Sequence, residues 1–144
     1  MKVVVQRVKE AHVTVDEKTV GKINNGFLVL VGFTYGDNEE VISWMINKIL
    51  NLRVFDDQDG VMNLSIKDVN GSILSVSQFT LYGDCSKGNR PSYIKALKPD
   101  KATLLYDKFN DKLKEEINTQ TGIFGADMKV SLVNDGPITI VIEK

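Results

Sequence analysis

The sequence has very few of the side chains on which many enzymes and metalloproteins depend. Its 144 residues include one histidine, His12, and one cysteine, Cys85. A single cysteine cannot form an internal disulfide, so we expect a protein of the reducing cytoplasm. One histidine and one cysteine are also too few for a zinc site, and we expect no metal and no other cofactor.

Long apolar runs and an excess of charge are absent too. No run approaches the roughly 18 apolar residues of a membrane span. Segment 1–7 has a charge after three valines and no small-residue cleavage site, so we expect neither a signal peptide nor a membrane partner. Eighteen basic and nineteen acidic residues give a net charge of −1. Because domains that bind nucleic acid over a whole face are strongly basic, we expect no DNA partner and only local RNA contacts.

Signatures of nucleotide and metal chemistry are also missing. Gly83 and Gly88 do not stand at a strand-to-helix junction followed by lysine and a hydroxyl residue, as a phosphate-binding loop requires. The acidic segment 56–59 lacks the spacing of a calcium loop. His12 lies within a strand pattern, where a structural or surface role is the ordinary one. Nucleotide hydrolysis is therefore not indicated.

The length and an apolar content of 42% suit one domain with its own core, and we predict a single domain over residues 1–144. β-Branched residues over 2–8 and 11–15 predict two strands. An Asn25-Gly26 sequence then predicts a tight hairpin turn before the uncharged apolar segment 27–33. We place that segment at the centre of a sheet.

Two segments have the apolar spacing of helices. In the first, Glu40 follows Asp37 by three positions, as in a capping box, and apolar residues recur up to Leu50. In the second, Pro99 and the residue after it begin a helix that Thr121-Gly122 ends. Its apolar stripe has members four apart: Leu105, Phe109, Leu113 and Ile117.

The remaining segments favour strands joined by turns. We expect strands over 52–55 and 72–78, then a long basic loop over 82–98 that forms a contact surface, and then two final strands. The final strands are 128–133 and 138–142, with 134–137 as the turn between them. This order predicts an α+β fold in which two helices cover a mostly antiparallel sheet.

The residues alone leave the chemistry open. Thr80 is a hydroxyl at the end of a strand, but no adjacent base is evident to activate it. Cys85 lies beside Asp84, whose charge opposes formation of a thiolate. Ser77 and Thr80 are also ordinary strand residues that satisfy backbone groups. A thiol hydrolase and a non-catalytic nucleic-acid-binding module that uses loop 87–98 therefore remain alternatives.

Two motifs resemble the signatures of the D-aminoacyl-tRNA deacylase family: Ser77-Gln78-Phe79-Thr80-Leu81 and Asn134-Asp135-Gly136-Pro137-Ile138-Thr139. The resemblance continues in the same order and spacing over essentially the whole chain, through segments 1–8, 51–55, 62–65, 88–92 and 121–126. Tyr93 and Ile138 stand where members often have phenylalanine and valine, and both are mild changes.

The resemblance implies a cytoplasmic homodimer that removes D-amino acids from tRNA, and glycine from non-cognate tRNA, without a cofactor. In such proteins the Gly136-Pro137 bond is cis, and this turn of one subunit enters the active site of the other, where it rejects L-amino acids. The resemblance implies that the catalytic site contains Ser77, Gln78, Phe79 and Thr80. In this reading the backbone and the substrate itself assist hydrolysis.

The basic loop is the expected place for tRNA contacts. Four exposed cations would bind phosphates beside the pocket without reading the base sequence: Lys87, Arg90, Lys95 and Lys98. A solvated basic loop with no ligand is the alternative.

Overall fold

The central element of the sheet is strand β1, Lys2–Val15. In the computed structural model, which describes residues 1–144, one edge of β1 pairs with β8, Lys129–Glu143. The other edge pairs first with β3, Gly26–Gly32, and then with β2, Lys18–Ile23. All three partners run antiparallel to β1. The two strands predicted over 2–8 and 11–15 are one continuous strand.

The hairpin turn after β1 lies at Asp16 and Glu17. Both residues have positive φ, +46° and +63°, as the two central residues of a type I′ turn require. The turn predicted at Asn25-Gly26 is wrong, because β3 continues β2 along the same edge of β1. Gly26 has a different reason to be glycine: a Cβ there would lie 1.8 Å from the Ser72 carbonyl oxygen.

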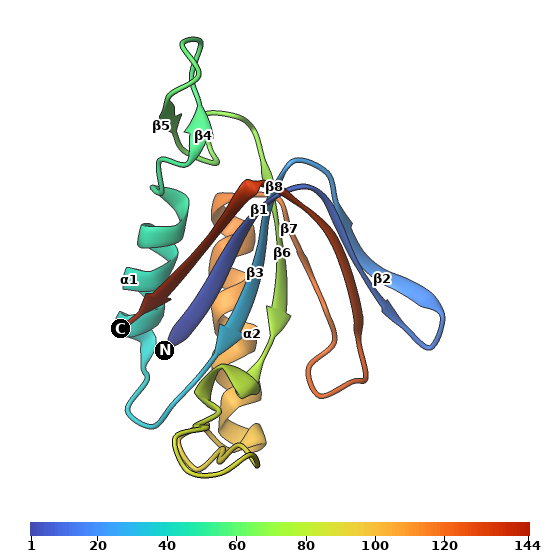
Figure 1. The fold of residues 1–144 in the computed structure, drawn as a ribbon, viewed down its shortest axis with the longest axis vertical. Coiled ribbons are helices and arrows are strands. Elements are labelled where there is room, and N and C mark those ends of the chain that lie inside the picture. The colour runs from blue at the N-terminus through green and yellow to red at the C-terminus, as the bar shows by residue number, and fades with distance from the viewer.

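Two of the five strand pairings in this sheet are parallel. Strand β6, Ser72–Ser77, pairs with β3, and β7, Thr119–Thr121, pairs with β6. The six strands form a strongly curved, barrel-like sheet, with two helices against one side (Figure 1). The predicted α+β class with a mostly antiparallel sheet and two helices is therefore confirmed.

A separate two-stranded hairpin projects from one end of the molecule. It consists of β4, Phe55–Asp56, and β5, Met62–Leu64. Figure 1 shows this hairpin and the loop that follows β6 at opposite ends of the long axis. The strand predicted over 52–55 is thus shorter and begins only at Phe55.

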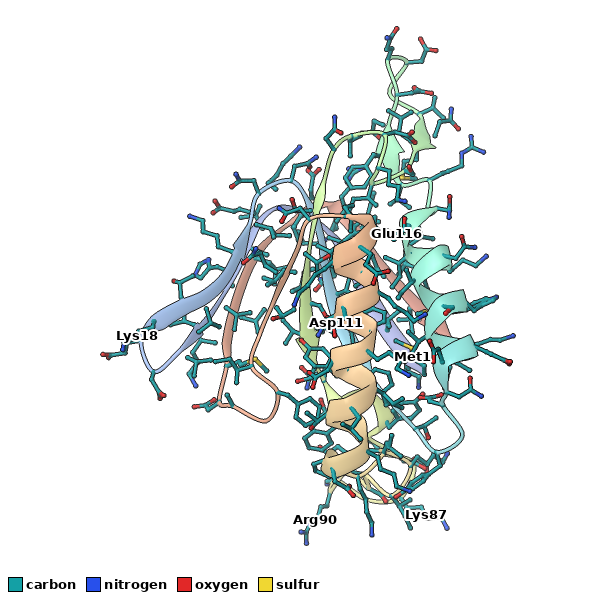
Figure 2. The ribbon with its side chains drawn as sticks, turned by 180° about the vertical axis from the view of Figure 1, so that it is seen from behind. Met1, Lys18, Lys87, Arg90, Asp111 and Glu116 are labelled. Atoms are coloured by element: carbon teal, nitrogen blue, oxygen red, sulfur yellow. The ribbon has the colours of Figure 1, made fainter.

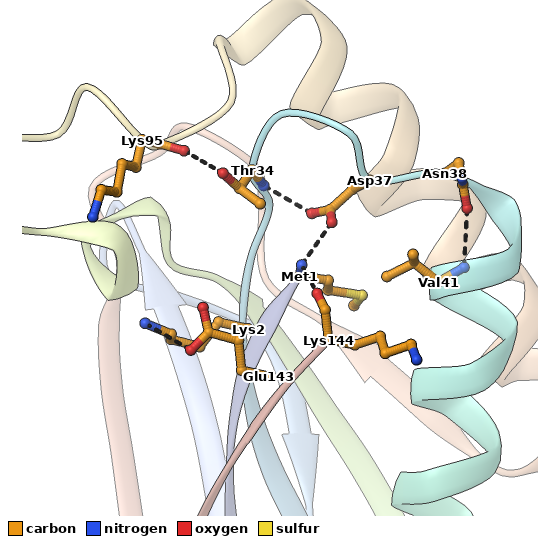
Figure 3. Close-up of polar contacts among 9 residues, drawn as sticks. All are labelled: Met1, Lys2, Thr34, Asp37, Asn38, Val41, Lys95, Glu143 and Lys144. Carbon is orange, nitrogen blue, oxygen red and sulfur yellow. Dashed lines mark hydrogen bonds and ion pairs between the residues drawn. The ribbon is translucent and has the colours of Figure 1, made fainter.

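Helix α1, Glu39–Leu50, begins at a different cap from the predicted one. The side chain of Asn38 accepts a hydrogen bond from the Val41 amide at 3.1 Å, so Asn38 is the N-cap. Asp37 instead accepts from the Thr34 amide at 2.8 Å and from the Met1 amine at 2.6 Å (Figure 3). The Asp37 side chain is 4% exposed, and pairing with the buried ammonium satisfies its charge.

Helix α2, Pro99–Glu116, begins where the sequence predicts, with proline in its first turn. It ends five residues before Thr121, because Ile117 is extended and the chain then pairs with β6 as β7. Tertiary strand pairing overrides the apolar spacing that extended the predicted helix to Ile117. Neither α1 nor α2 is long and apolar enough to cross a membrane.

The core lies on both faces of the sheet because side chains alternate along each strand. Phe27, Val29 and Val31 of β3 face the helices and pack with Phe109 and Leu113 of α2. A smaller cluster on the other face contains alternate residues of the same strands and lies inside the curve of the sheet: Val8, Ala11, Val13, Ile23, Leu28, Leu74 and Val76. Packing on both faces of the sheet therefore fixes the positions of the ends of β3 and β6.

Asp37 and Asn38, which precede α1, should contribute unequally to the free energy of unfolding. Asn38→Ala removes one exposed helix cap and should lower the free energy of unfolding by about 1 kcal/mol. Asp37→Ala leaves the Met1 ammonium buried without its partner and should cost about 3 kcal/mol. Urea unfolding of both variants measures the difference. Equal losses would contradict the roles assigned to Asp37 and Asn38.

Candidate functional site

A cavity of about 650 Å³ opens where β3 and β6 both end. The carboxyl ends of these two parallel strands form one side of it, at Val31 and Ser77. Loop 93–98, the first turn of α2 and segment 124–130 form the other sides. Most of its lining residues are hydrophobic, so the cavity suits a flat apolar group held by a few polar contacts.

The chain leaves β6 through a 3₁₀ turn, η1, Phe79–Tyr82, with Gln78 as its N-cap. The Gln78 amide donates to the Val31 carbonyl at 2.7 Å, which ties the start of the turn to β3. The first bond of the turn runs from the Leu81 amide to the Gln78 carbonyl at 3.2 Å. The amides of Phe79 and Thr80 precede this bond and have no acceptor within the turn. Such N–H groups can stabilise a developing negative charge.

The side chains of the first motif divide into two groups. Ser77, Gln78 and Phe79 line the cavity, whereas Thr80 is exposed and does not line it. The Thr80 hydroxyl accepts a hydrogen bond from the Gln78 side-chain amide. Because an amide cannot remove a proton, this contact does not activate Thr80 as a nucleophile.

Aromatic rings surround the mouth of the cavity. Phe79 is 56% exposed and meets Tyr93 edge to face, with ring centroids 5.1 Å apart. Tyr35 and Ile94 also line the cavity and are exposed. Because so many large apolar side chains at one opening are unusual for a protein surface, they mark a binding site.

The four predicted phosphate-binding cations lie at different distances from the cavity. Lys98 lines it, directly before α2. Lys95 belongs to the same loop, and its carbonyl accepts from the Thr34 hydroxyl at 2.6 Å. Lys87 and Arg90 lie beyond the N-terminal end of α2, at the tip of the molecule (Figure 2). A ligand that reaches from the cavity to these two residues must extend along the loop.

The second motif forms a bulge in β8 instead of the predicted turn between two strands. Both halves of β8 pair with β1, with Thr139 opposite Gln6 and Asn134 opposite Val8. Between these pairs β8 has three residues more than β1, and they loop out as residues 135–137. A bulge that remains in register on both sides presents its residues without reversing the chain.

Hydrogen bonds close the neck of this 135–137 loop. The Asn134 side-chain amide donates to the carbonyls of Ile138 at 2.9 Å and Arg7 at 3.0 Å. The guanidinium of Arg7, which is 7% exposed, donates to the Asp135 carbonyl at 3.3 Å and lies 3.2 Å from its carboxylate. Another nitrogen of Arg7 donates to the Val54 carbonyl at 2.6 Å. The loop is therefore held rigidly against β1 and the base of the β4–β5 hairpin.

The tip of the loop is exposed backbone. Gly136 has φ +119°, and a Cβ there would lie 2.9 Å from the Ile138 side chain, so glycine is required. The Gly136-Pro137 bond is cis, and both residues are exposed. The loop presents main-chain groups and a proline ring to whatever approaches it.

Within one chain, the two motifs are far apart. Arg7, which holds the 135–137 loop, pairs with Phe27, whereas Ser77, the first residue of the other motif, lies at the level of Val31 and Val3. Four residues of extended strand separate these levels, which is about 14 Å. A single protomer therefore does not bring residues 77–80 and 136–137 together.

Other residues weighed from the sequence lie away from the cavity. Cys85 is exposed and does not line it, and His12 lies within β1 between β2 and β8. The Asp57 carboxylate accepts from the Asn63 side chain and two backbone amides, and these bonds lower its pKa. The acidic segment 56–59 thus stabilises its own hairpin. The structure contains no group of three or more His, Cys, Asp or Glu that could hold a metal ion.

Several residues of the site escaped the sequence reasoning. Arg7 is a buried charge in a strand rich in valine, and a charge in such a strand indicates that it has a specific partner. Phe124 lies in segment 121–126, which matched the family pattern but received no role. Tyr35 and Ile94 carried no signal, because a loop residue shows its place at a cavity only in three dimensions.

Known proteins resemble this chain in sequence and in fold. The sequence matches the family described as D-Tyr-tRNA(Tyr) deacylase over residues 4–143. It is 59% identical over 145 residues to a D-aminoacyl-tRNA deacylase of Flavobacterium psychrophilum, covering 99% of this chain and 97% of the relative. It is 58% identical to a D-aminoacyl-tRNA deacylase of an Exiguobacterium species, covering 100% and 99%.

Two solved structures share the fold of this chain. The c-Myc DNA Unwinding Element Binding Protein has a TM-score of 0.95 and 40% identity, covering 100% of this chain and 99% of that one. A eukaryotic protein analysed as a D-amino acid tRNA deacylase has a TM-score of 0.84 and 18% identity, covering 98% and 97%, and shows the fold alone.

The fold and the sequence relatives together define an enzyme of the hydrolase class. More narrowly, the chain belongs to the D-Tyr-tRNA(Tyr) deacylase family, and it is similar over its whole length to the D-aminoacyl-tRNA deacylases of the two bacterial relatives. The resemblance found in the two sequence motifs is thereby confirmed.

The two cations that contact Asp135 should contribute unequally to stability. Arg7→Met removes a buried partner of this carboxylate and leaves the Val54 carbonyl without its donor, so we expect a loss of about 3 kcal/mol. Lys9 lies 3.2 Å from the same carboxylate but is 64% exposed, and Lys9→Met should cost less than about 0.5 kcal/mol. Urea unfolding tests both, and a large effect of Lys9→Met would be inconsistent with the loop being held from beneath.

Proposed function

We propose that this enzyme acts in the cytoplasm as a homodimer in which the 135–137 loop of each subunit lies at the cavity of its partner. The observation that carries the proposal is the distance between the two motifs within one chain. The cavity is open on one side, and Gly136 and Pro137 at the tip of the loop are exposed. A second copy related by a two-fold axis would place each loop at the other end of its partner, where the cavity lies.

The cavity would hold the 3′ end of the charged tRNA. An adenine ring suits a site with exposed aromatic side chains, and Phe79 with Tyr93 behind it offers a stacking surface. Lys98 would contact the adjacent phosphate, and Lys95, Lys87 and Arg90 would contact more distant phosphates along the loop. These contacts would add salt-dependent affinity without reading sequence.

Hydrolysis would depend on positioned main-chain groups. Water adds to the ester carbonyl carbon, negative charge develops on the carbonyl oxygen, and the amides of Phe79 and Thr80 stabilise it. The ester oxygen then leaves with a proton as a ribose hydroxyl of tRNA. The neighbouring ribose hydroxyl of the substrate helps to activate the water, while Ser77 and Gln78 orient the bound amino acid.

The 135–137 loop would act as a stereochemical filter. A rigid backbone beside the α-carbon leaves no space for the side chain of an L-amino acid, so rejection depends on a clash instead of an attractive contact. A D side chain points away from the loop. Glycine has no side chain to exclude, so glycine on a non-cognate tRNA is an expected second substrate.

Gly136→Ala tests the filter. Because Gly136 has a backbone conformation that disfavours a side chain, the substitution should distort the 135–137 loop and raise the cleavage of L-aminoacyl-tRNA at least about tenfold. Cleavage of the D-form should remain within about threefold. Deacylation of matched D- and L-aminoacyl-tRNA measures both rates. The proposal fails if the wild-type protein cleaves both forms equally, or if this variant keeps full selectivity.

A mixing experiment tests whether the loop acts on the partner's cavity. Gln78→Ala should reduce activity without changing the loop, and Gly136→Ala should lose selectivity without changing the cavity. After the two variants are unfolded and refolded together, each mixed dimer has one functional cavity, facing an intact loop. Cleavage of the L-form per active site should therefore fall below that of Gly136→Ala alone. No change on mixing would place the loop and the cavity in the same subunit.

Thr80→Ala distinguishes the main chain from the side chain. If the Thr80 amide acts and its hydroxyl does not, the variant should keep kcat within about fivefold of wild type, because removal of an oxyanion donor costs about 100-fold or more. Steady-state deacylation of D-aminoacyl-tRNA provides the measurement. Complete loss of turnover in a folded variant would contradict a main-chain role and return the Thr80 hydroxyl as the candidate nucleophile.

Nucleic-acid binding is a second candidate function. A solved structure 40% identical to this chain is of a protein named for binding a DNA unwinding element. The net charge of −1 argues against extensive DNA contact by this chain. Filter binding of DNA and tRNA, measured beside deacylation on one preparation, separates the two: tight DNA binding with no ester cleavage would favour the second candidate.

A further inference from the structure

Tyr106 lies beneath the cavity and is not among its lining residues. It belongs to α2, is 3% exposed, and its ring centroid lies 5.8 Å from that of Phe124, a wall of the cavity. Its hydroxyl donates to the Ser75 carbonyl at 2.8 Å. One side chain therefore contacts both a cavity wall and strand β6, which ends in the proposed catalytic motif.

The Ser75 carbonyl is a junction of three parts of the site. Besides the Tyr106 hydroxyl, it accepts from the Gly122 amide at 2.9 Å. Gly122 leads into segment 124–126, which lines the cavity, and Ser75 lies two residues before Ser77, the last residue of β6. Two hydrogen bonds to one oxygen thus link β6, α2 and segment 122–126.

Other buried polar groups lie beside this hydroxyl. The Ser75 hydroxyl and the Asn110 carboxamide oxygen are buried nearby on the same two elements, and neither has a hydrogen-bond partner. No other side chain donates to the Ser75 carbonyl. Burial raises the pKa of the Tyr106 hydroxyl, so the hydroxyl keeps the proton that it donates to the Ser75 carbonyl.

We propose that Tyr106 is a positioning residue of the deacylase: its hydroxyl sets the place of the Phe79 and Thr80 amides relative to the cavity wall at Phe124. This inference rests on the proposed function, in which the wall binds the tRNA end and the amides bind the developing charge. If the strand end moves against that wall, bound substrate no longer has its carbonyl oxygen at the amides. Binding would then survive while the chemical step slows.

The test separates kcat from KM. Tyr106→Phe keeps the ring on Phe124 and removes the donor, so kcat for D-aminoacyl-tRNA should fall about tenfold with KM within about twofold. Tyr106→Leu also removes the ring, and KM should rise as well. The matched control is Tyr82→Phe, because Tyr82 is also buried but its hydroxyl has no hydrogen-bond partner. That variant should keep wild-type kcat and KM.

A rescue variant excludes a purely structural effect. Incorporation of p-aminophenylalanine at position 106 restores a donor at the end of the ring and should restore kcat, including in the case that Tyr106→Phe does not fold. Unchanged kcat in Tyr106→Phe, or a folded rescue variant with kcat as low as that of Tyr106→Phe, would overturn the inference. Phe79→Ala identifies the other failure: if KM stays unchanged there, the proposed substrate site itself is wrong, whatever Tyr106 does.

Discussion

The structure depends on the hydrogen bonding of β1 along both of its edges. This strand of 14 residues pairs with β8 on one side and with β2 and β3 on the other. This pairing aligns β8 with β3 across β1, so the bulge in β8 and the cavity at the end of β3 have fixed positions along β1. The distance between the two motifs follows from strand register, and no side-chain rearrangement within a protomer can close it.

Local patterns in the sequence predicted the elements that local physics determines. The uncharged run in β3, the proline at the start of α2 and the apolar face of α1 were all sufficient to place those elements. Asn25-Gly26 and Asp37 were misread because their partners are distant in sequence. The backbone of Ser72 requires Gly26, and the Met1 amine competes for Asp37. Neither contact has a local signature.

The candidate site also contains residues that have a pattern in the sequence and residues that depend on distant contacts. Ser77 to Thr80 were found from a resemblance, and the structure adds why that segment suits ester chemistry: the chain enters a 3₁₀ turn whose first amides have no acceptor within it. Arg7 and Tyr106 act through carbonyl groups of residues distant along the chain, Asp135 and Ser75. A side chain that supports a backbone oxygen has no pattern in one sequence, because almost any residue supplies that oxygen.

The bulge in β8 also has a consequence for how such an enzyme changes over time. Its three extra residues lie outside the ladder, and β8 pairs with no strand other than β1. Substitutions there do not repack the hydrophobic interior or alter the opening beside β6. If the 135–137 loop acts as the proposed stereochemical filter, substrate preference would reside in a segment that can vary separately from turnover. Descendants of one ancestor could then acquire new substrate tolerance while retaining the same catalytic machinery.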